Sequence, residues 1–236
     1  MDYRKPAVFG ENWSPSRYKV LPYFAAERAV LSRPDIQRIL EIGCGNGWNM
    51  SRFAQNGRVA FGLDAVPERV ALAQNHGPSL LADGLKLPFA DSSLDMIYIQ
   101  HVLHHIGDVA RALAEVRRCL RPGGVLFLIE TVEDNPIIRW GRKLYPRWLG
   151  DEINASFTFA GLASGLAGNG FRVQRAGQYS TLFWLWEILP DQFPIMEKAT
   201  PIVVPVEQFL QRFGRRYSAH CYLVAEKEGW AAPAAS

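Results

Sequence analysis

The sequence predicts an α/β fold in which helices cover both faces of a doubly wound, mostly parallel β-sheet. Between residues 37 and 130, short apolar runs alternate with segments of helical pattern, and this alternation builds a parallel sheet with right-handed crossovers. The apolar run at 38–42 ends in a turn with glycine at every second position, Gly43, Gly45 and Gly47. A buried strand, a glycine turn and a following helix together form a ligand-binding edge of such a sheet.

The elements can be assigned in chain order from apolar runs, proline and glycine. Ser14 could cap a first helix that runs to about Ser32, with Pro22 as a break. We then expect strands at 37–43, 58–64, 79–82, 94–100 and 124–130, and helices at 48–55, 67–75 and 108–120. A helix from Ser156 to Gly168, a strand at 171–177 and a last strand from Ala219 to Glu226 complete the chain.

Length and composition indicate one globular domain over residues 1–236. This length suits one α/β domain with some decoration and is too short for two catalytic domains. The content of 48% hydrophobic and 21% charged residues is that of a folded protein. The net charge is +3, but Lys and Arg are scattered and no nucleic-acid motif occurs, so we expect no nucleic-acid partner.

The cysteines and the hydropathy pattern bear on the compartment. Cys44, Cys119 and Cys221 are odd in number and far apart, which suits a reducing compartment better than a disulfide framework. The N-terminus lacks an apolar core of signal-peptide length, and no run of about eighteen apolar residues occurs. We therefore expect a cytoplasmic protein that does not span a membrane.

The glycine turn distinguishes between two classes of cofactor. A dinucleotide fingerprint, G-x-G-x-x-G, would need glycine at the position of Trp48. The pattern here is E-x-G-x-G-x-G, with Glu41 at the end of the strand. A carboxylate at this place would repel a pyrophosphate and suits a ligand that carries an ammonium or sulfonium group.

With these residues the sequence resembles the class I S-adenosylmethionine-dependent methyltransferases. The resemblance continues, in the order typical of that family, through Asp64, Ala82-Asp83-Gly84, residues 95–105 and residues 120–126. It implies a Rossmann-like, seven-stranded sheet with an antiparallel last strand and a cofactor-binding core over 36–131. It further implies a lid over 1–35, although a helix packed on the sheet edge is an equal alternative. The implied cofactor is S-adenosyl-L-methionine, with S-adenosyl-L-homocysteine as product.

The resemblance also assigns candidate site residues. Glu41 would reach the cofactor's ammonium, Asp64 the ribose hydroxyls and Asp83 the adenine amino group. The alternatives are a helix cap for Asp64 and a plain turn aspartate for Asp83. The full cofactor-binding set is Glu41, Gly43, Cys44, Gly45, Asn46, Asp64, Ala65, Asp83, Gly84, Gln100 and His101.

Three of the five histidines, His101, His104 and His105, follow the fourth strand, close to where the transferable methyl would lie. Metal binding is not expected, because no acidic ligand stands between them and such an ending begins a helix in this family. His101 and His104 are the candidate catalytic residues, as a base or an orienting group; packing and loop structure is the alternative. We expect His105 to be buried against the helix.

Two insertions, 132–155 and 178–217, exceed what a minimal domain needs and are expected to build the substrate side. Residues 136–149 mix aromatic residues with four cations, and residues 181–193 are almost entirely apolar. These segments could cover a hydrophobic acceptor or rest on a membrane surface. A buried helix or a homodimer interface is the alternative.

The predicted function is methyl transfer by in-line displacement to a small, largely apolar or aromatic acceptor at oxygen, nitrogen or carbon. The sequence has no N-P-P-Y or D-P-P-Y motif after the fourth strand and no P-C nucleophile, which leaves the small-molecule branch, similar to quinone-biosynthesis and natural-product methyltransferases. Two alternatives stay open. One is a membrane-surface enzyme for a lipid-linked or glycolipid acceptor, and the other is a non-catalytic cofactor-binding partner or scaffold.

Overall fold

The computed structural model describes residues 22–136, 139–140, 154–179, 202, 205–207, 209–210, 212, 214 and 217–229. The strands are β1 (Arg38–Ile42), β2 (Val59–Asp64), β3 (Ser79–Leu81), β4 (Leu94–Gln100), β5 (Leu120–Thr131), β6 (Phe171–Tyr179) and β7 (His220–Lys227). The α-helices are α2 (Pro22–Leu31), α3 (Trp48–Phe53), α4 (Pro67–Ala73), α5 (Val109–Cys119) and α7 (Phe159–Gly168). Two short 3₁₀ turns are η1 (Gln55–Gly57) and η2 (Leu103–His105).

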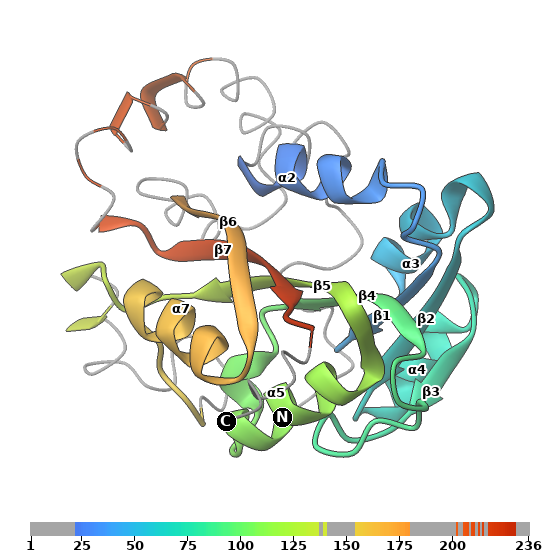
Figure 1. The fold of residues 1–236 in the computed structure, drawn as a ribbon. Coiled ribbons are helices and arrows are strands. Elements are labelled where there is room, and N and C mark those ends of the chain that lie inside the picture. Colours follow the sequence, from blue (N-terminus) through green and yellow to red (C-terminus); the bar gives the residue numbers. More distant parts are fainter. Residues whose placement is uncertain are drawn as a thin grey trace.

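The described strands form one seven-stranded sheet in the order β3-β2-β1-β4-β5-β7-β6 (Figure 1). Neighbouring strands from β3 to β5 pair in parallel, whereas β7 runs antiparallel to both β5 and β6. The predicted α/β fold with a mostly parallel sheet and an antiparallel last strand is therefore confirmed. The order reverses direction between β1 and β4, so the carboxyl ends of these two strands form the crevice where α/β sheets bind ligands.

Most predicted boundaries agree with the structure within two residues, and two do not. The fifth strand begins at Leu120 rather than at 124, because Leu120 pairs with Leu94 before a register shift in the ladder. Helix α7 begins at Phe159 rather than at Ser156, because the Thr158 side chain accepts a hydrogen bond from the Gly161 backbone and caps the helix.

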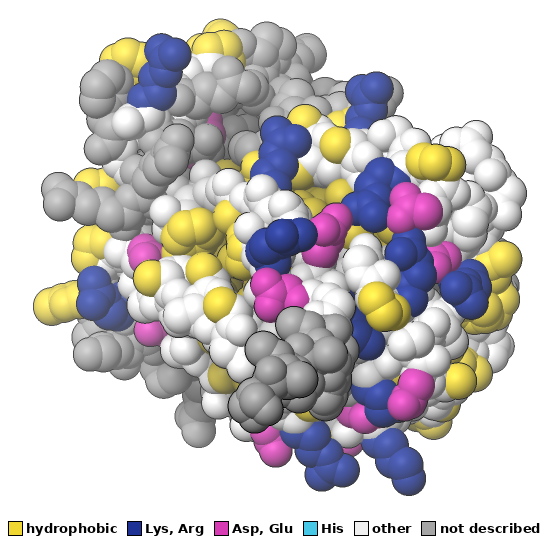
Figure 2. Space-filling view, in the orientation of Figure 1, with side chains coloured by type: hydrophobic (Ala, Val, Ile, Leu, Met, Phe, Trp, Pro, Cys, Tyr) yellow, Lys and Arg dark blue, Asp and Glu magenta, His cyan; other side chains and the backbone are white. Residues whose placement is uncertain are grey.

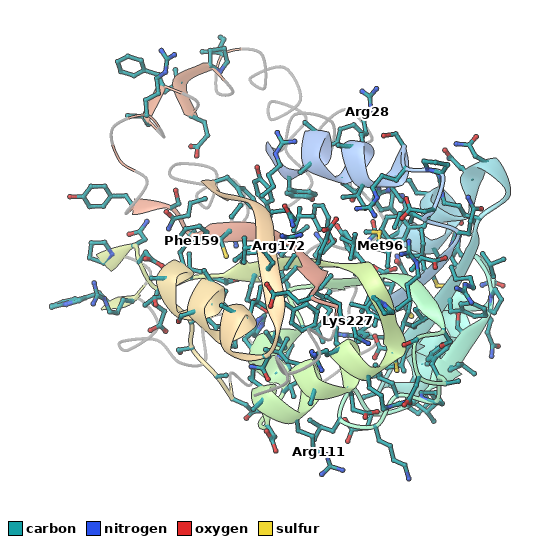
Figure 3. All side chains as sticks on the ribbon, viewed as in Figure 1. Arg28, Met96, Arg111, Phe159, Arg172 and Lys227 are labelled. Carbon is teal, nitrogen blue, oxygen red and sulfur yellow. The ribbon has the colours of Figure 1, made fainter. Side chains whose placement is uncertain are left out.

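The sheet separates two apolar layers. In β4, Ile97 and Ile99 pack with residues of α5 and α7, whereas Met96 and Tyr98 pack with residues of α2, α3 and α4. Alternate residues of a strand point to opposite faces, so each strand contributes to both layers. Figure 3 shows that Arg28 on α2 and Arg111 on α5 project away from the sheet on opposite sides, and both side chains are exposed.

Helix α2, the described part of the predicted lid segment, packs on a face of the sheet. The Tyr23 ring lies 5.5 Å from the Tyr179 ring of β6, measured between centroids. Glu27 is fully buried and pairs with Arg52 of α3. Tyr23 and Ala26 also join the apolar layer under the helix, and Tyr179 belongs to β6, an edge strand of the sheet. Residues 1–21, which would complete a lid, lie outside the described residues.

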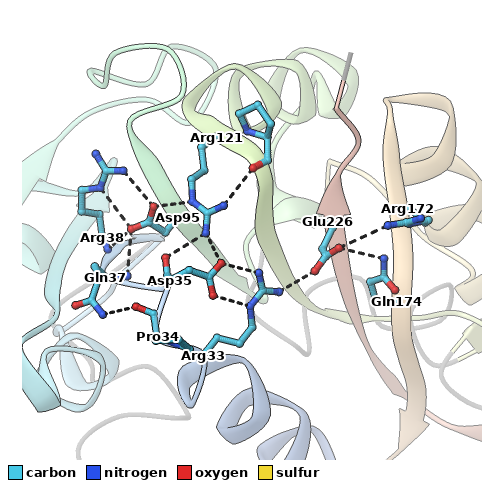
Figure 4. A network of polar contacts seen from close by, with 11 residues as sticks. Arg33, Pro34, Asp35, Gln37, Arg38, Asp95, Arg121, Arg172, Gln174 and Glu226 are labelled. Atoms are coloured by element: carbon cyan, nitrogen blue, oxygen red, sulfur yellow. Dashed lines mark hydrogen bonds and ion pairs between the residues drawn. The ribbon is translucent and has the colours of Figure 1, made fainter. Parts of the chain in front are cut away.

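A polar network joins the strands at the edge of the sheet opposite the glycine turn (Figure 4). Asp95 at the start of β4 accepts hydrogen bonds from the backbone of Gln37 and Arg38 and from the side chains of Arg38 and Arg121. Burial alone would raise the pKa of Asp95, but the hydrogen bonds from Arg38, Gln37 and Arg121 outweigh it, so the pKa lies below its usual value. The network fixes this edge and leaves the carboxyl edge available for a ligand.

The two predicted insertions lie largely outside the described residues. In the parts of the chain that the structure describes, no helix is long and apolar enough to cross a membrane. On the face shown in Figure 2, the described Lys and Arg side chains lie among Asp and Glu side chains instead of forming one basic area.

Candidate functional site

The glycine turn after β1 is held against β2 and α4. The backbone N–H groups of Gly43 and Cys44 donate to the Leu63 carbonyl at 2.6 and 3.0 Å. Gly47 has φ 84°, and a Cβ atom there would lie 2.9 Å from the Cα of Ala73. Glycine is thus required at position 47 both by its left-handed conformation and by the closeness of α4.

The other two residues of the turn serve its structure. Cys44 is buried, and burial raises the pKa of its thiol to about 12, so the thiol stays protonated and unreactive at neutral pH. The Asn46 side-chain oxygen accepts a hydrogen bond from the Trp48 backbone at 3.3 Å, at the start of α3. Their predicted contacts with a cofactor would therefore come from the backbone.

Glu41 is buried at the carboxyl end of β1. Its Oε1 accepts a hydrogen bond from Asn49 Nδ2 at 2.6 Å, whereas Oε2 has no hydrogen-bond partner among the described residues. Burial raises the pKa of Glu41 to about 8, and the hydrogen bond from Asn49 only partly opposes this rise. A buried carboxyl group with an unused oxygen favours a cationic partner, so this residue fits an ammonium group.

Asn49 connects Glu41 to neighbouring elements, and sequence reasoning missed it. Its amide nitrogen also donates to Gln100 Oε1 at 3.2 Å, and its amide oxygen accepts from Arg52 at 2.8 Å. Arg52 in turn pairs with the buried Glu27 of α2. The position of Asn49 in the first turn of α3 could have suggested a contact with the strand end, but no sequence signal links Glu27 to this site.

Asp64, the candidate ribose ligand, uses both carboxylate oxygens within the chain. Oδ2 accepts from the Gly45 backbone and Oδ1 from the Val66 backbone, each at 3.0 Å. Helix α4 has Val66 as its N-cap without a side-chain cap, so the helix-cap alternative does not describe Asp64. Asp64 fixes the glycine turn, and Ala65 beside it is exposed. A contact of Asp64 with ribose and a contact of Ala65 with the cofactor stay predictions.

Asp83 lies in an exposed turn after β3. Its Oδ1 accepts from the Leu85 backbone at 2.9 Å, and its carbonyl accepts from Lys86 at 3.1 Å. These contacts are those of the plain turn aspartate. Gly84 faces Ile106, whose Cδ1 would lie 3.3 Å from an added Cβ. Recognition of adenine by Asp83 and a contact of Gly84 with the cofactor stay predictions.

Gln100 and His101 end β4 and lie between two groups of polar residues. Gln100 Oε1 accepts from Asn49 and from the Tyr98 hydroxyl, so it joins the residues around Glu41. His101 has φ 53°, which is uncommon for a residue other than glycine and is found at functional sites. Its Nδ1 lies 3.3 Å from Thr131 Oγ1 at the end of β5.

The predicted burial of His105 is wrong, and His104 is the buried residue. His104 Nδ1 lies 2.6 Å from Oε1 of Glu130, whose side chain is fully buried, while His105 is exposed. In the 3₁₀ turn η2, Leu103 and His104 face the core and the following residue faces outward. Sequence reasoning missed Glu130, although an acid that ends an apolar strand is the same signal that identified Glu41.

Hydrogen bonds therefore join only some of the predicted site residues to one another. At the carboxyl edge of β1, β2 and β4, a hydrogen bond joins Asp64 to the glycine turn, and Asn49 joins Glu41 to Gln100. Within the described part of the chain, no three His, Cys, Asp or Glu residues are arranged to hold a metal ion.

The carboxyl edge of the sheet lies in a segment that matches a known protein family. Residues 40–128 match the model of a family described as a methyltransferase domain. The matched range begins in β1 and ends in β5, so it contains the glycine turn, Asp64, Asp83 and the β4 end.

Two curated bacterial proteins show the similarity in sequence. A Mycolicibacterium smegmatis protein named "Probable S-adenosylmethionine-dependent methyltransferase" is 33% identical over 129 residues, which are 53% of this chain and 48% of that protein. A demethylmenaquinone methyltransferase of Corynebacterium kroppenstedtii is 29% identical over 125 residues, 52% of this chain and 54% of that protein. The chain thus spans about half the length of the curated relatives it matches.

The fold is shared with solved structures. An S-adenosylmethionine-dependent methyltransferase from Mesorhizobium loti superposes with a TM-score of 0.63 at 21% identity, over 86% of this chain and 97% of that one. At this level of identity the similarity concerns the fold.

Proposed function

We propose that the chain is a class I S-adenosylmethionine-dependent methyltransferase and that it transfers a methyl group from S-adenosyl-L-methionine to a small acceptor molecule. The single observation that carries this proposal is Glu41. This buried carboxyl group stands beside the glycine turn and keeps one oxygen without a partner among the described residues. An ammonium group at that oxygen would satisfy it and would stabilise its charged form.

Each part of the carboxyl edge supports one contact with the cofactor. Glu41 would bind the ammonium group, the main chain from Gly43 to Asn46 would line the methionyl and ribose parts, and Asp64 would accept from the ribose. Asp83 with Gly84 would border the adenine. When bound, S-adenosyl-L-methionine supplies a methyl group on a positively charged sulfur, which suits a site with buried carboxylates.

The chain's own contribution to the rate would be alignment and exclusion of water. In-line displacement from a sulfonium disperses charge on the way to the transition state, so little acid–base chemistry is needed for the donor. Positioning of the two reactants can contribute roughly 7–11 kcal/mol to lowering the barrier. The rigid β1 and β4 ends, fixed by Asn49, provide such positioning on the donor side.

Calorimetric titration with S-adenosyl-L-homocysteine tests the donor site. We expect Glu41→Gln to weaken binding by about 10- to 100-fold, because a charge-assisted hydrogen bond contributes roughly 1.5–3 kcal/mol. Asp64→Ala should also weaken binding, since the glycine turn loses a hydrogen-bond acceptor. Glu68→Gln, on the exposed side of α4, is the control and should bind like the wild type. Absence of binding to the folded wild-type protein would refute the proposal.

We propose a small, largely apolar or aromatic acceptor. The name of the Corynebacterium kroppenstedtii relative, a demethylmenaquinone methyltransferase, supports an acceptor in the small-molecule class. Transfer of labelled methyl from S-adenosyl-L-methionine to a metabolite extract separates an enzyme from a non-catalytic cofactor-binding partner. The non-catalytic alternative predicts binding of the cofactor without any labelled product.

A second candidate is an acceptor presented at a membrane surface. Ile202, Val206 and Phe209 are exposed and recur at the spacing of one helix face, and Trp140 is exposed as well. An apolar helix face with an aromatic residue suits contact with a lipid surface. Co-sedimentation with anionic vesicles tests this candidate. If the wild type and Phe209→Ser both stay in the supernatant, the result contradicts this candidate and supports an acceptor in solution.

A further inference from the structure

Glu27 of helix α2 is a buried carboxyl group to which the donor site assigns no direct contact. It is fully buried, and Glu41 of β1 is only 3% exposed. Glu41 pairs with Tyr98 of β4, whose ring packs in the apolar layer under α2 and α3, so both carboxyl groups lie on this face of the sheet. A buried carboxylate is costly unless positive charge or hydrogen bonds compensate it. The environment of Glu27 therefore calls for a physical explanation.

Arg52 of α3 compensates Glu27 and is held in one orientation. Its two terminal nitrogens pair with the two carboxylate oxygens of Glu27, and the pair that involves Oε2 is 3.0 Å long. The guanidinium carbon lies 4.7 Å from the ring centroid of the buried Phe53 and 5.3 Å from that of Trp48. A two-pronged ion pair that also packs on aromatic rings has little freedom to turn. The orientation of Arg52 thus depends on Glu27.

The direction of the hydrogen bonds beyond Arg52 follows from the chemistry of the side chains. An arginine can only donate, so the Asn49 atom that faces it at 2.8 Å is the amide oxygen. The amide nitrogen is then turned to Glu41 Oε1 at 2.6 Å and to Gln100 Oε1 at 3.2 Å, which uses both of its hydrogens. Glu27 and Arg52 therefore determine which way the Asn49 amide faces.

This direction matters because Glu41 can take two forms. The neutral carboxyl group can either donate to an amide or accept from it, whereas the ionised group can only accept. Because Asn49 donates to Glu41, it favours the ionised form, which is the form that attracts an ammonium group. Burial raises the pKa of Glu41, and the hydrogen bond from Asn49 and the charge of Arg52 oppose this rise. An Asn49 that could turn over would instead accept from the neutral carboxyl group and stabilise the form that does not bind a cation.

We propose that Glu27 and Arg52 are positioning residues of the donor site, which keep the Asn49 amide turned so that it donates to Glu41. Because Glu27 belongs to α2, docking of this helix and binding of an ammonium group at Glu41 then strengthen each other. Such a coupling has the same size in both directions. This inference rests on the proposed binding of S-adenosyl-L-methionine and adds helix α2 to the elements that determine its affinity.

Calorimetric titration of the full-length chain with two ligands separates positioning from a general loss of structure. S-adenosyl-L-homocysteine carries the ammonium group, whereas 5′-deoxy-5′-methylthioadenosine lacks the whole amino-acid part. The main variant combines Glu27→Leu with Arg52→Met, because replacing both members of a buried ion pair by apolar residues is often neutral for stability. We expect it to bind S-adenosyl-L-homocysteine about tenfold more weakly and to bind the fragment within about threefold of the wild type. An ion pair with a purely structural role predicts unchanged affinity for both ligands.

Asn49→Ala tests the same contacts with the ion pair left in place, so the test stays decisive if the double variant does not fold. Its affinity for S-adenosyl-L-homocysteine should fall by about tenfold, and its affinity for the fragment should not change. The control is Arg33→Met, which removes the ion pair between a residue that follows α2 and Glu226 of β7, at the opposite edge of the sheet. It should bind both ligands like the wild type.

Hydrogen exchange followed by mass spectrometry measures the coupling from the side of α2. In the wild type, S-adenosyl-L-homocysteine should slow the exchange of residues 22–31, because the ligand favours the docked helix. The slowing should be absent in Asn49→Ala, where α2 is no longer linked to Glu41, and present in Arg33→Met. This readout decides the question also if the fragment binds the wild type too weakly to titrate.

The outcomes separate this inference from the proposed function. A wild type that does not bind S-adenosyl-L-homocysteine would overturn both. If the wild type binds it and the double variant and Asn49→Ala bind it equally well, the positioning role is wrong and the methyltransferase stands. An equal loss of affinity for both ligands would also overturn the positioning role, because it would show general damage to the site. So would a slowing of exchange in α2 that persists in Asn49→Ala.

Discussion

At the scale of single residues, burial sets the protonation state of Glu41. A strand end that is closed off from water raises the cost of a carboxylate, and Asn49 supplies only one hydrogen bond in return. In the protein without ligand, the Glu41 carboxyl group therefore keeps its proton at neutral pH. Binding of an ammonium group should release this proton, which makes cofactor affinity increase with pH up to about pH 8.

The same residue predicts a pH dependence of stability without any ligand. The Glu41 carboxyl loses its proton near pH 4.5 in the unfolded chain and near pH 8 in the folded protein. Between these values folding takes up a proton, so the free energy of unfolding falls as the pH rises. Glu41→Gln stays neutral in both states and should gain stability relative to the wild type from pH 5 to pH 8, by on the order of a few kcal/mol. Urea unfolding at pH 5, 6.5 and 8 measures this.

Glu68→Gln serves as the control for that experiment, because Glu68 is exposed on α4. Its difference from the wild type should stay nearly constant over the same range. If the curves of Glu41→Gln and the wild type run parallel from pH 5 to pH 8, Glu41 is ionised in the folded protein and the account of its burial is wrong.

At the scale of elements, the ion pair between Glu27 of α2 and Arg52 of α3 joins two helices on one face of the sheet. Glu27 is fully buried, and Arg52 also donates to Asn49, so the pair connects α2 to the Glu41 site. Removing one partner of a buried pair leaves a charge in the interior and costs roughly 3–5 kcal/mol. We expect Arg52→Ala to lower the free energy of unfolding by about this amount and to weaken binding of S-adenosyl-L-homocysteine.

The matched control is the exposed pair between Arg118 and Asp91, whose aspartate side chain is 78% exposed. Asp91→Asn should cost less than about 1 kcal/mol, because water screens exposed ion pairs. Chemical denaturation of both variants gives the comparison. Equal small losses would mean that α2 is held by apolar contacts alone and that the link to Glu41 has no energetic weight.

The elements themselves could be predicted from the sequence because their signals are local. Apolar runs bounded by glycine and proline located every described strand of the sheet, and Pro67 marked the start of α4. The start of α7 was misplaced because Thr158, not Ser156, provides the cap. The order of His104 and His105 was missed because a 3₁₀ turn has a shorter period than the expected helix.

At the scale of the whole molecule, the contacts that define the site depend on strand order, which local patterns do not contain. Glu130 and His104 meet because β4 and β5 are neighbours and η2 folds back onto the end of β5. Glu27 meets Arg52 because α2 lies on the same face as α3. Glu41 and the glycine turn could be found in the sequence because they follow one strand, whereas the pairing of His104 with Glu130 required the assembled sheet.

Strand order also predicts how the molecule opens. Strand β4 lies between β1 and β5 and is buried over almost its whole length, so its amides should exchange with solvent only when the protein unfolds globally. Strand β3 is a three-residue edge strand with Leu81 58% exposed, so its amides should exchange through local opening. Hydrogen exchange followed by mass spectrometry should therefore show fast labelling at 79–81 and the slowest labelling at 94–100.

Addition of S-adenosyl-L-homocysteine should slow exchange in the glycine turn at 43–47 far more than in β3. If β3 were as protected as β4 in the free protein, another surface must cover β3, and β3 would not be an exposed edge strand.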